Sequence, residues 1–400
     1  KGPVLVDIPK DLTAQKVEFL PPAPPEQEKH HLFPFEQRFE QALQMLEKAE
    51  RPFVYAGGGV IASGASEALK TFAERLDAPV ACSLMCQGGF DQTDSRYMGM
   101  LGMHGTHAAN IAMQRCDLLI AVGCRFSDRV ALKPATFAQN AKIVQIDIDR
   151  SEINKNVQTD HHIIGDARRV LELLLERVPS MKHDDWKQYV FSFKTETEYD
   201  EADDHLTPSQ VLFSLAKLTP QDTIVSTDVG QHQMWAIQHF HFDYPGQLLT
   251  SGGFGTMGFG LGAAIGAQVS HPDKVVLHIT GDGGFRMNCN ELATEQYYNL
   301  PIINIVFNNG TLGMVRQWQT LIYDKHYEAT TLDRAPDFVK LAEAYGLSGR
   351  RVRNQQELEE AIQEALQCGH GYIIDCMIDI DEKVRPMVGG GSHITEFMLN

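Results

Sequence analysis

The stretch that most restricts the possible folds of this chain runs from residue 275 to residue 309 and reads VVLHITGDGGFRMNCNELATEQYYNLPIINIVFNN. An apolar run at 275–280 is followed by a glycine-rich turn at 281–284, a helix-like stretch at 288–298 and a second apolar run at 301–307. This order predicts a strand–helix–strand unit. Because such crossovers are right-handed and lay their strands parallel, we expect both strand ends at the edge where open sheets bind ligands.

The polar residues at these two strand ends predict a magnesium–diphosphate site. Asp282 and Asn309, which lies 27 positions later, would offer a carboxylate and an amide oxygen to one crevice. Mg²⁺ keeps few protein ligands and completes its octahedron with water and phosphate oxygens. The glycines let the backbone approach a diphosphate, and the N-terminus of the next helix favours its charge. A surface turn with ordinary polar strand ends is the alternative, because short glycine motifs are weak signals alone.

Taken whole, the 275–309 pattern resembles the thiamine diphosphate motif of the thiamine diphosphate-dependent decarboxylase and carboligase family. The resemblance implies that Asp282, Asn309 and the backbone carbonyl of Thr311 hold Mg²⁺. It also implies a set of thiamine diphosphate contacts: Val229, Gly230, Gln231, His232, Gly255, Met257, Gly283 and Gly284. Met257 would support the coenzyme in a bent shape. In this shape the amino or imino nitrogen of the coenzyme lies next to the coenzyme's reacting carbon. A structural histidine and a tightly packed small-residue helix are the alternatives for His232 and for residues 250–269.

Bulk properties exclude several classes of protein. A chain of 400 residues with 43% hydrophobic residues is globular and long enough for two domains. Its net charge of -17 argues against a nucleic-acid partner or an anionic membrane surface. No apolar run approaches the roughly 20 residues that span a bilayer. The seven scattered cysteines include no paired zinc motif, which indicates reduced thiols and a cytoplasmic protein.

Two series of alternating strands and helices predict an α/β chain with two doubly wound parallel-sheet domains. The first series occupies residues 35–180, with helices at 35–49, 65–77, 106–115 and 165–178 and strands at 51–61, 79–84, 117–123 and 142–147. The second occupies residues 207–400, with strands at 221–227 and 372–378 and helices at 231–240, 335–345 and 355–367. We expect the acidic residues 181–206 to form a linker and His161-His162 to be exposed.

The beginning of the chain carries a separate expectation. Residues 1–11 contain an apolar, strand-like run, and residues 18–36 are rich in proline, as linkers are. We therefore interpret residues 1–34 as the last strand of a preceding domain followed by a linker, with a processed mature start as the alternative.

Three segments of the first series resemble the middle domain of acetohydroxyacid synthases, also called acetolactate synthases, which binds flavin adenine dinucleotide (FAD). They are GMLGMHGTH at 99–107, GCRFSDRV at 123–130 and QIDIDRSEI at 145–153. The resemblance implies FAD contacts from ten residues: Gly57, Gly58, Leu101, Met103, His104, Gly123, Arg125, Glu152, Ile153 and Asp166. Without it, glycine turns and a solvated arginine explain these positions equally well.

The segment GMVRQWQ at 313–319 resembles the substrate pocket of the same family. By this resemblance Met314 and Trp318 line the pocket, and with Met257 they form the predicted catalytic set. Trp318 would favour an ethyl-bearing over a methyl-bearing 2-keto acid, although one methylene is worth only about 1–3 kcal/mol in an apolar pocket. An aromatic side chain in a dimer contact is the alternative.

The resemblance implies a complete activity: decarboxylation of pyruvate on thiamine diphosphate and transfer of the hydroxyethyl unit to pyruvate or 2-ketobutyrate. It further implies a homodimer or tetramer, a regulatory small subunit, and a catalytic glutamate in an N-terminal domain. Because we expect that domain to be missing, we predict that this chain alone is inactive. A catabolic acetolactate synthase, a pyruvate oxidase and a non-thiamine nucleotide-binding protein are the alternatives, the last lacking its Gly-x-Gly-x-x-Gly signature.

Overall fold

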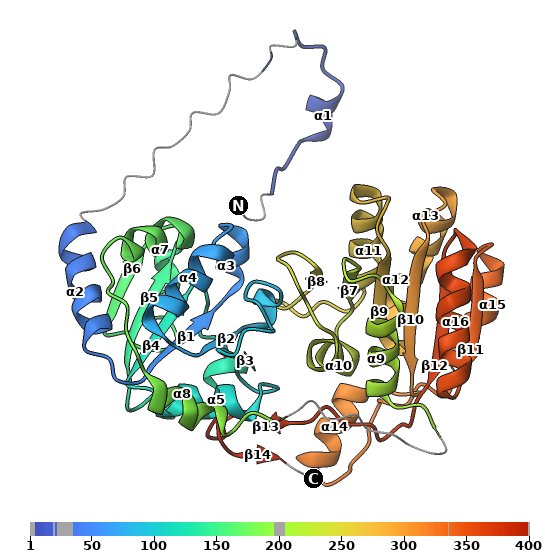
Figure 1. The fold of residues 1–400 in the computed structure, drawn as a ribbon. Coiled ribbons are helices and arrows are strands. Elements are labelled where there is room, and N and C mark those ends of the chain that lie inside the picture. The colour runs from blue at the N-terminus through green and yellow to red at the C-terminus, as the bar shows by residue number, and fades with distance from the viewer. Residues whose placement is uncertain (1–4, 19–20, 22–34, 196–204, 335, 399–400) are drawn as a thin grey trace. The chain divides into compact units, whose positions relative to one another are not determined.

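The computed structural model describes residues 5–18, 21, 35–195, 205–334 and 336–398 (Figure 1). Residues 1–33 and residues 34–400 form separate compact units. In the described part of the first unit, Leu5, Val6 and Ile8 are exposed and helix α1 spans Lys10–Thr13. The strand predicted at 1–11 is therefore wrong for residues 5–11, because a lone strand is not stable. Most of the predicted proline-rich linker lies outside the described residues.

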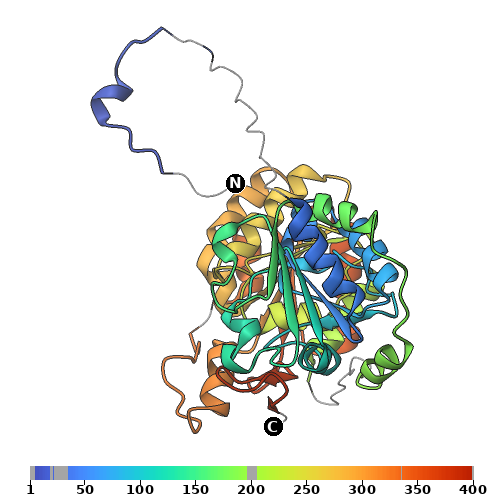
Figure 2. The same ribbon diagram turned by 90° about the vertical axis from the view of Figure 1, so that its left-hand side faces the viewer.

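The second unit contains two six-stranded sheets, and the first has the strand order β3-β2-β1-β4-β5-β6. Its strands are β1 (Pro52–Ala56), β2 (Val80–Cys82), β3 (Tyr97–Met100), β4 (Leu118–Val122), β5 (Lys142–Asp147) and β6 (His161–Ile164). All of its pairs are parallel, and Figure 2 shows the strands running side by side. The chain reverses direction across the sheet between β1 and β4, which is a topological switch point.

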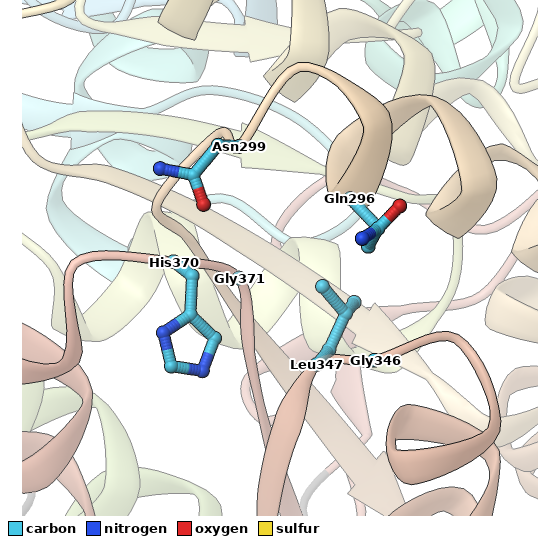
Figure 3. Close-up of a pocket in the computed structure, with 6 residues that line it drawn as sticks. All are labelled: Gln296, Asn299, Gly346, Leu347, His370 and Gly371. Carbon is cyan, nitrogen blue, oxygen red and sulfur yellow. The ribbon is translucent and has the colours of Figure 1, made fainter.

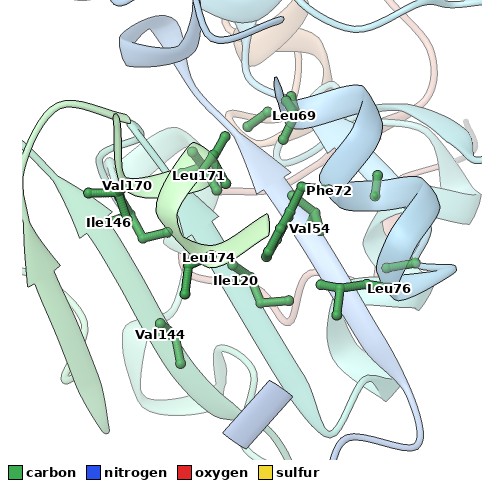
Figure 4. Close-up of a cluster of buried hydrophobic side chains, with 14 of the residues drawn as sticks. Val54, Leu69, Phe72, Leu76, Ile120, Val144, Ile146, Val170, Leu171 and Leu174 are labelled. Atoms are coloured by element: carbon green, nitrogen blue, oxygen red, sulfur yellow. The ribbon is translucent and has the colours of Figure 1, made fainter. Parts of the chain in front are cut away.

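Helices cover both faces of this sheet, as a parallel sheet requires. They are α2 (Phe35–Glu47), α3 (Gly58–Ala62), α4 (Ser66–Leu76), α5 (His107–Arg115), α6 (Asp128–Ala131), α7 (Ala167–Leu175) and α8 (Asp184–Phe191). On one face, α4 and α7 place fully buried side chains such as Phe72 and Leu171 against Val54 and Ile120 of the strands (Figure 4). The opposite face, with Phe53 of β1, packs against a cluster that includes α5 and α8.

The second sheet has the order β11-β12-β10-β9-β7-β8, again with all pairs parallel. Its strands are β7 (Ile224–Thr227), β8 (Leu248–Thr250), β9 (Val276–Gly281), β10 (Ile302–Asn308), β11 (Ser348–Val352) and β12 (Tyr372–Met377). Phe307 pairs with Gly281, so the predicted parallel unit is confirmed and its strand ends are neighbours. The switch point lies between β7 and β9. The predicted α/β class with two doubly wound sheets is confirmed.

Eight α-helices are described around the second sheet. They are α9 (Pro208–Leu218), α10 (Gln231–His239), α11 (Phe259–Ser270), α12 (Asp282–Asn288), α13 (Leu292–Tyr297), α14 (Gly313–Leu321), α15 (Phe338–Ala344) and α16 (Gln355–Cys368). Short strands β13 (Met387–Val388) and β14 (Phe397–Met398) pair near the end of the chain. The Val388 N–H donates to the Met103 carbonyl (2.7 Å), so this hairpin is bound to the first sheet's side of the unit.

Three local expectations are wrong, whereas the helical stretch expected at 288–298 is confirmed as a 3₁₀ turn at Cys289–Glu291 followed by α13. The predicted turn at 281–284 is already helical, because Gly281 caps α12 and Asp282 is its first residue. His161 is buried (9% exposed) on strand β6, where its ring bonds the Arg38 carbonyl. The acidic segment expected to be a linker contains α8, whose Trp186 is buried and donates to the Pro52 carbonyl (2.9 Å).

Within the described ranges, no helix is long and apolar enough to cross a membrane. All seven cysteines are free thiols, and five of them are buried.

Candidate functional site

A cavity of about 90 Å³ lies where the carboxyl ends of β7, β9 and β10 meet, at the switch point of the second sheet. Every residue predicted to bind thiamine diphosphate or the metal lines it, except Gly255. The lining residues are Val229, Gly230, Gln231, His232, Trp235, Met257, Gly281, Asp282, Gly283, Gly284, Phe307, Asn309, Thr311, Leu312, Gly313, Met314 and Val315. The fold thus brings together residues from segments up to 86 positions apart in the sequence.

The predicted metal ligands are held together by direct hydrogen bonds. The Gly310 N–H donates to Asp282 Oδ2 (2.9 Å), which joins the end of β9 to the loop after β10. The Thr311 N–H donates to Asn309 Oδ1 (3.2 Å), while the Thr311 hydroxyl donates to the Thr330 carbonyl. Burial raises the pKa of Asp282 to about 6, against the opposing effect of its backbone donors. A bound cation would favour the ionised carboxylate.

The chemistry of this donor set fits Mg²⁺. A single carboxylate, one amide oxygen and one backbone carbonyl are hard oxygen ligands, and they leave room for water and phosphate oxygens. Among the described residues, no group of three or more His, Cys, Asp or Glu side chains is arranged to hold a metal ion. A soft or strongly chelated metal is therefore a poorer fit than a diphosphate-bound magnesium ion.

Two buried polar atoms beside the cavity have no hydrogen-bond partner among the described residues: Gln231 Oε1 and His232 Nε2. The Gln231 amide nitrogen is already engaged, since it donates to Gln317 Oε1 (2.9 Å) and to the Glu382 carbonyl (2.7 Å). Burial, with a smaller effect from the neighbouring His278, lowers the pKa of His232 to about 3, so its ring is neutral. Unpaired buried groups of this kind fit a polar ligand.

Two glycines allow the loops of the site to pack closely. A Cβ on Gly283 would lie 2.7 Å from Leu312 Cδ2, and one on Gly313 would collide with Gln231 Oε1. The segments around these positions can come this close only because the side chain is absent.

Asp228 is missed by reasoning from the sequence, yet it organises two loops of the site. It directly follows β7, as Asp282 follows β9, and this equivalent position is the available signal. Its carboxylate accepts from the N–H groups of Val229 (2.6 Å) and Gly258 (2.9 Å). Burial raises the pKa of Asp228. The bonds connect the 229–232 loop to the segment that carries Met257.

Two predicted residues stand apart from the cavity. Gly255 is exposed, with a left-handed φ of 72°, and a Cβ there would lie 3.8 Å from the side chain of Val229. Trp318 lies one turn beyond Met314 on α14 and packs against a cluster that includes Met387 and Val388. Met314 lines the cavity, whereas the substrate contact of Trp318 stays a prediction.

The ten residues predicted to contact FAD share the carboxyl edge of the first sheet. Gly57 and Gly58 follow β1, residues 101–104 follow β3, Gly123 and Arg125 follow β4, Glu152 and Ile153 follow β5, and Asp166 follows β6. The loops after β1 and β4 touch at the switch point, where the Gly57 N–H donates to the Val122 carbonyl (2.9 Å).

The side chains at this edge differ in whether they already have hydrogen-bond, ion-pair or packing partners within the chain. His104 Nδ1 is buried without a partner among the described residues, and burial lowers the pKa of His104 to about 4. Arg125 is exposed, while Glu152 pairs with Lys155 (2.7 Å). Asp166 caps α7. Leu101 and Met103 are buried in the apolar cluster. An unpaired imidazole nitrogen beside glycine loops fits a nucleotide-type ligand.

A prediction for stability rests on the contact between these loops. A Cβ on Gly57 would collide with the Gly123 carbonyl oxygen and with Cys124, both fixed by the sheet. Gly57→Ala is expected to lower the free energy of unfolding by about 1–3 kcal/mol, measured by urea denaturation. The control is Gly262→Ala at an exposed position of α11, where no packing neighbour is described within 4 Å of the new methyl group. That control should instead stabilise by about 0.5–1 kcal/mol, and equal effects of the two changes would contradict the prediction.

A second hollow, of about 180 Å³, is lined by Gln296, Asn299, Gly346, Leu347, His370 and Gly371 (Figure 3). Its residues precede β10, β11 and β12, so it lies at the amino edge of the second sheet. Parallel sheets bind their ligands at the opposite edge. We therefore assign the chemistry to the cavity that contains Asp282.

Comparison with known proteins agrees with this assignment. Residues 228–376 match the family described as thiamine pyrophosphate enzyme, C-terminal TPP binding domain, and residues 39–174 match its central domain. A probable acetolactate synthase large subunit of Methanococcus aeolicus is 40% identical, over 99% of this chain and 70% of that protein. The acetolactate synthase isozyme 2 and isozyme 3 large subunits of Escherichia coli are 42% and 40% identical, each with 72% of its length covered.

Proposed function

The chain belongs to the acetolactate synthase large-subunit family of thiamine pyrophosphate enzymes, and from this premise we propose the reaction that it catalyses. The protein is a transferase that removes CO₂ from pyruvate and joins the remaining hydroxyethyl unit to a second 2-keto acid, pyruvate or 2-ketobutyrate. This is the first common step of branched-chain amino acid biosynthesis. The observation that carries the proposal is the cavity at the switch point of the second sheet. This one site holds the strand-end loops, the Asp282 carboxylate and two buried polar atoms, Gln231 Oε1 and His232 Nε2, without a partner among the described residues.

In this proposal the residues of the cavity bind and orient thiamine diphosphate and Mg²⁺. Bound there, the coenzyme supplies an electron sink for decarboxylation. Asp282, Asn309 and the Thr311 carbonyl hold the magnesium ion, and the 229–232 loop with Gly283 and Gly284 binds the diphosphate. His232 adds no charge to the site, because burial keeps its ring neutral. Met257 supports the coenzyme ring, because a flexible thioether fills irregular apolar gaps. Met314 borders the space left for the keto acid and helps to exclude water.

We also propose that the carboxyl edge of the first sheet binds FAD, with His104, Arg125 and the glycine loops as its contacts. The support is the unpaired His104 nitrogen and the close backbone approach at Gly57 and Gly123. Purified protein should release FAD when it is denatured, yet consume no oxygen with pyruvate. A flavin-free protein that still forms acetolactate would favour the catabolic type of enzyme, and oxygen uptake with pyruvate would favour an oxidase.

The proposed assembly is a homodimer or tetramer that binds a regulatory small subunit. The support is the large-subunit name of the relatives. Phe254 and Met287 are also exposed, at 95% and 58%. Light scattering of the natural full-length chain, alone and with the small subunit from the same source, tests this assembly.

Substitution of Trp318 tests the proposed selection between second substrates. Trp318→Leu is expected to lower the preference for 2-ketobutyrate over pyruvate by about tenfold or more, because apolar contact with one methylene is worth about 1–3 kcal/mol, or about 10–200-fold. The measurement is the ratio of acetohydroxybutyrate to acetolactate with both acids present. The control is Tyr323→Leu, since Tyr323 is also aromatic but 61% exposed. An unchanged ratio in Trp318→Leu would assign Trp318 to packing against the 387–388 strand instead.

A further inference from the structure

Beside the proposed metal ligands lies a charge network that the proposed reaction does not use, built around one buried carboxylate. Its centre is Asp375, a residue of β12 that is 0% exposed. Asp375 Oδ2 accepts from Arg351 Nε (2.7 Å), and Arg351 also reaches Asp337 (3.1 Å), which caps α15. A fully buried carboxylate persists only when it is paired and hydrogen-bonded, and Arg351 supplies that pairing.

The other oxygen of this carboxylate points toward β10, the strand that leads to the proposed metal ligands. Asp375 Oδ1 accepts from Asn308 Nδ2 (2.8 Å), and Asn308 is the last residue of β10. The main chain of Asn308 is fixed as well, since its carbonyl accepts from the Ile378 N–H (3.2 Å). The side chain and the backbone of Asn308 are thus both tied to β12, on the side of β10 opposite to β9.

This attachment matters because Asn308 directly precedes the proposed metal ligands in the chain. The next three residues contain Asn309 and Thr311, two of the three proposed magnesium ligands, and Gly310, which bonds the third ligand, Asp282. The loop of residues 309–311 is therefore held at two points. On one side Asn308 bonds Asp375 of β12, and on the other Gly310 bonds Asp282 at the end of β9. Metal sites depend on such outer partners, because these partners fix the direction of the ligand atoms.

From this geometry we propose that Asp375, held by Arg351, is a positioning residue for the magnesium loop: it fixes Asn308 and thereby orients the Asn309 amide and the Thr311 carbonyl. The inference rests on the proposed coenzyme site. It also explains why a fully buried carboxylate, paired with a partly exposed arginine, stands near the carboxyl end of this sheet.

The test is the affinity for Mg²⁺ at a saturating, fixed concentration of thiamine diphosphate, measured by isothermal titration calorimetry on the natural full-length chain. Asp375→Asn keeps the size of the side chain but removes its charge and one of its two acceptor oxygens, so that it cannot accept from both Asn308 and Arg351. It is expected to weaken Mg²⁺ binding about 10–100-fold, the range found when outer partners of a metal site are lost. A purely structural role would lower stability and leave the Mg²⁺ affinity of the folded protein unchanged.

Two further variants keep the result interpretable. Asn308→Ala removes the link and leaves the Asp375–Arg351 pair intact, so it carries the test if Asp375→Asn fails to fold. The control is Glu295→Gln, which alters a buried carboxyl group of α13 bonded to Asn304, an earlier residue of β10, and should leave Mg²⁺ affinity within about twofold. Unchanged Mg²⁺ affinity in folded Asp375→Asn and Asn308→Ala would overturn this inference but leave the proposed coenzyme site standing. Absence of Mg²⁺-dependent binding by the unaltered protein would overturn the proposed site together with it.

Discussion

Replacing Asp282 with Asn is expected to weaken Mg²⁺-dependent binding of thiamine diphosphate by at least about 100-fold, since even outer partners of metal sites contribute about 10–100-fold. Asp282 is the one carboxylate among the residues described as lining the cavity, and it is 2% exposed. The variant keeps an oxygen ligand but loses the negative charge that attracts the cation. Acetolactate formation should fall to the same extent. Calorimetric titration and product formation provide the two measurements.

The control for this change is Asp273→Asn. Asp273 lies shortly before the same strand, β9, but is exposed and distant in sequence from the carboxyl end of that strand. The Asp273→Asn variant should bind Mg²⁺ and thiamine diphosphate with the same affinity as the unaltered protein. If Asp282→Asn were folded and bound them equally well, the metal site would have to lie elsewhere.

Glu295→Gln is expected to abolish a large pH dependence of stability. Glu295 is 0% exposed, and the Asn304 amide donates to both of its oxygens (3.1 and 3.2 Å). Asn304 in turn bonds the buried His278 ring (2.8 Å). Burial raises the pKa of Glu295 from 4.5 to about 8, and the bond from Asn304 opposes this shift only partly. The folded protein therefore holds a proton at neutral pH that the unfolded chain releases.

The sign of the pH dependence is set by this proton. Between pH 4.5 and about 8 the folded state binds more protons than the unfolded state, so the free energy of unfolding falls as pH rises. The slope is at most about 1.4 kcal/mol per pH unit, and the whole effect is on the order of 4 kcal/mol. Glutamine imitates the neutral acid, so Glu295→Gln should be more stable than the unaltered protein at pH 8 and show a flatter profile.

Urea unfolding at several pH values between 5 and 8 measures this difference. Glu343→Gln, an exposed change on α15, is the control and should keep the original slope. A Glu295→Gln variant with the same slope as the unaltered protein would mean that Glu295 is ionised in the fold, despite its close packing against Gly371.

The parts of the molecule that the sequence predicts well are those with strong local patterns. The apolar runs of β9 and β10 are long enough to be read as buried strands, and their parallel pairing follows from the connecting helix. Given that pairing, the proximity of Asp282 and Asn309 is a geometric consequence. The glycine-rich loops after β1, β4 and β9 are placed at strand ends for the same reason.

Other parts are missed because their pattern is weak or their partners are distant. Strand β11 reads SGRRV and is only partly buried at the edge of its sheet, so it lacks an apolar run. Helix α8 is mistaken for linker because acidic residues surround its two buried anchors, Trp186 and Val190. The network of Asp375 joins residues from three strands, and the spacing of residues within one segment of the sequence cannot predict such a contact.

The proposed function is tested most directly by product analysis with pyruvate, with and without 2-ketobutyrate, in the presence of thiamine diphosphate, Mg²⁺ and FAD. The natural full-length chain is compared with the 400-residue chain. We expect acetolactate from the full-length chain, with a shift to acetohydroxybutyrate when 2-ketobutyrate is added. Acetaldehyde, acetate or acetyl phosphate as the product would contradict the proposal, because the same coenzyme site would then serve a decarboxylase or an oxidase.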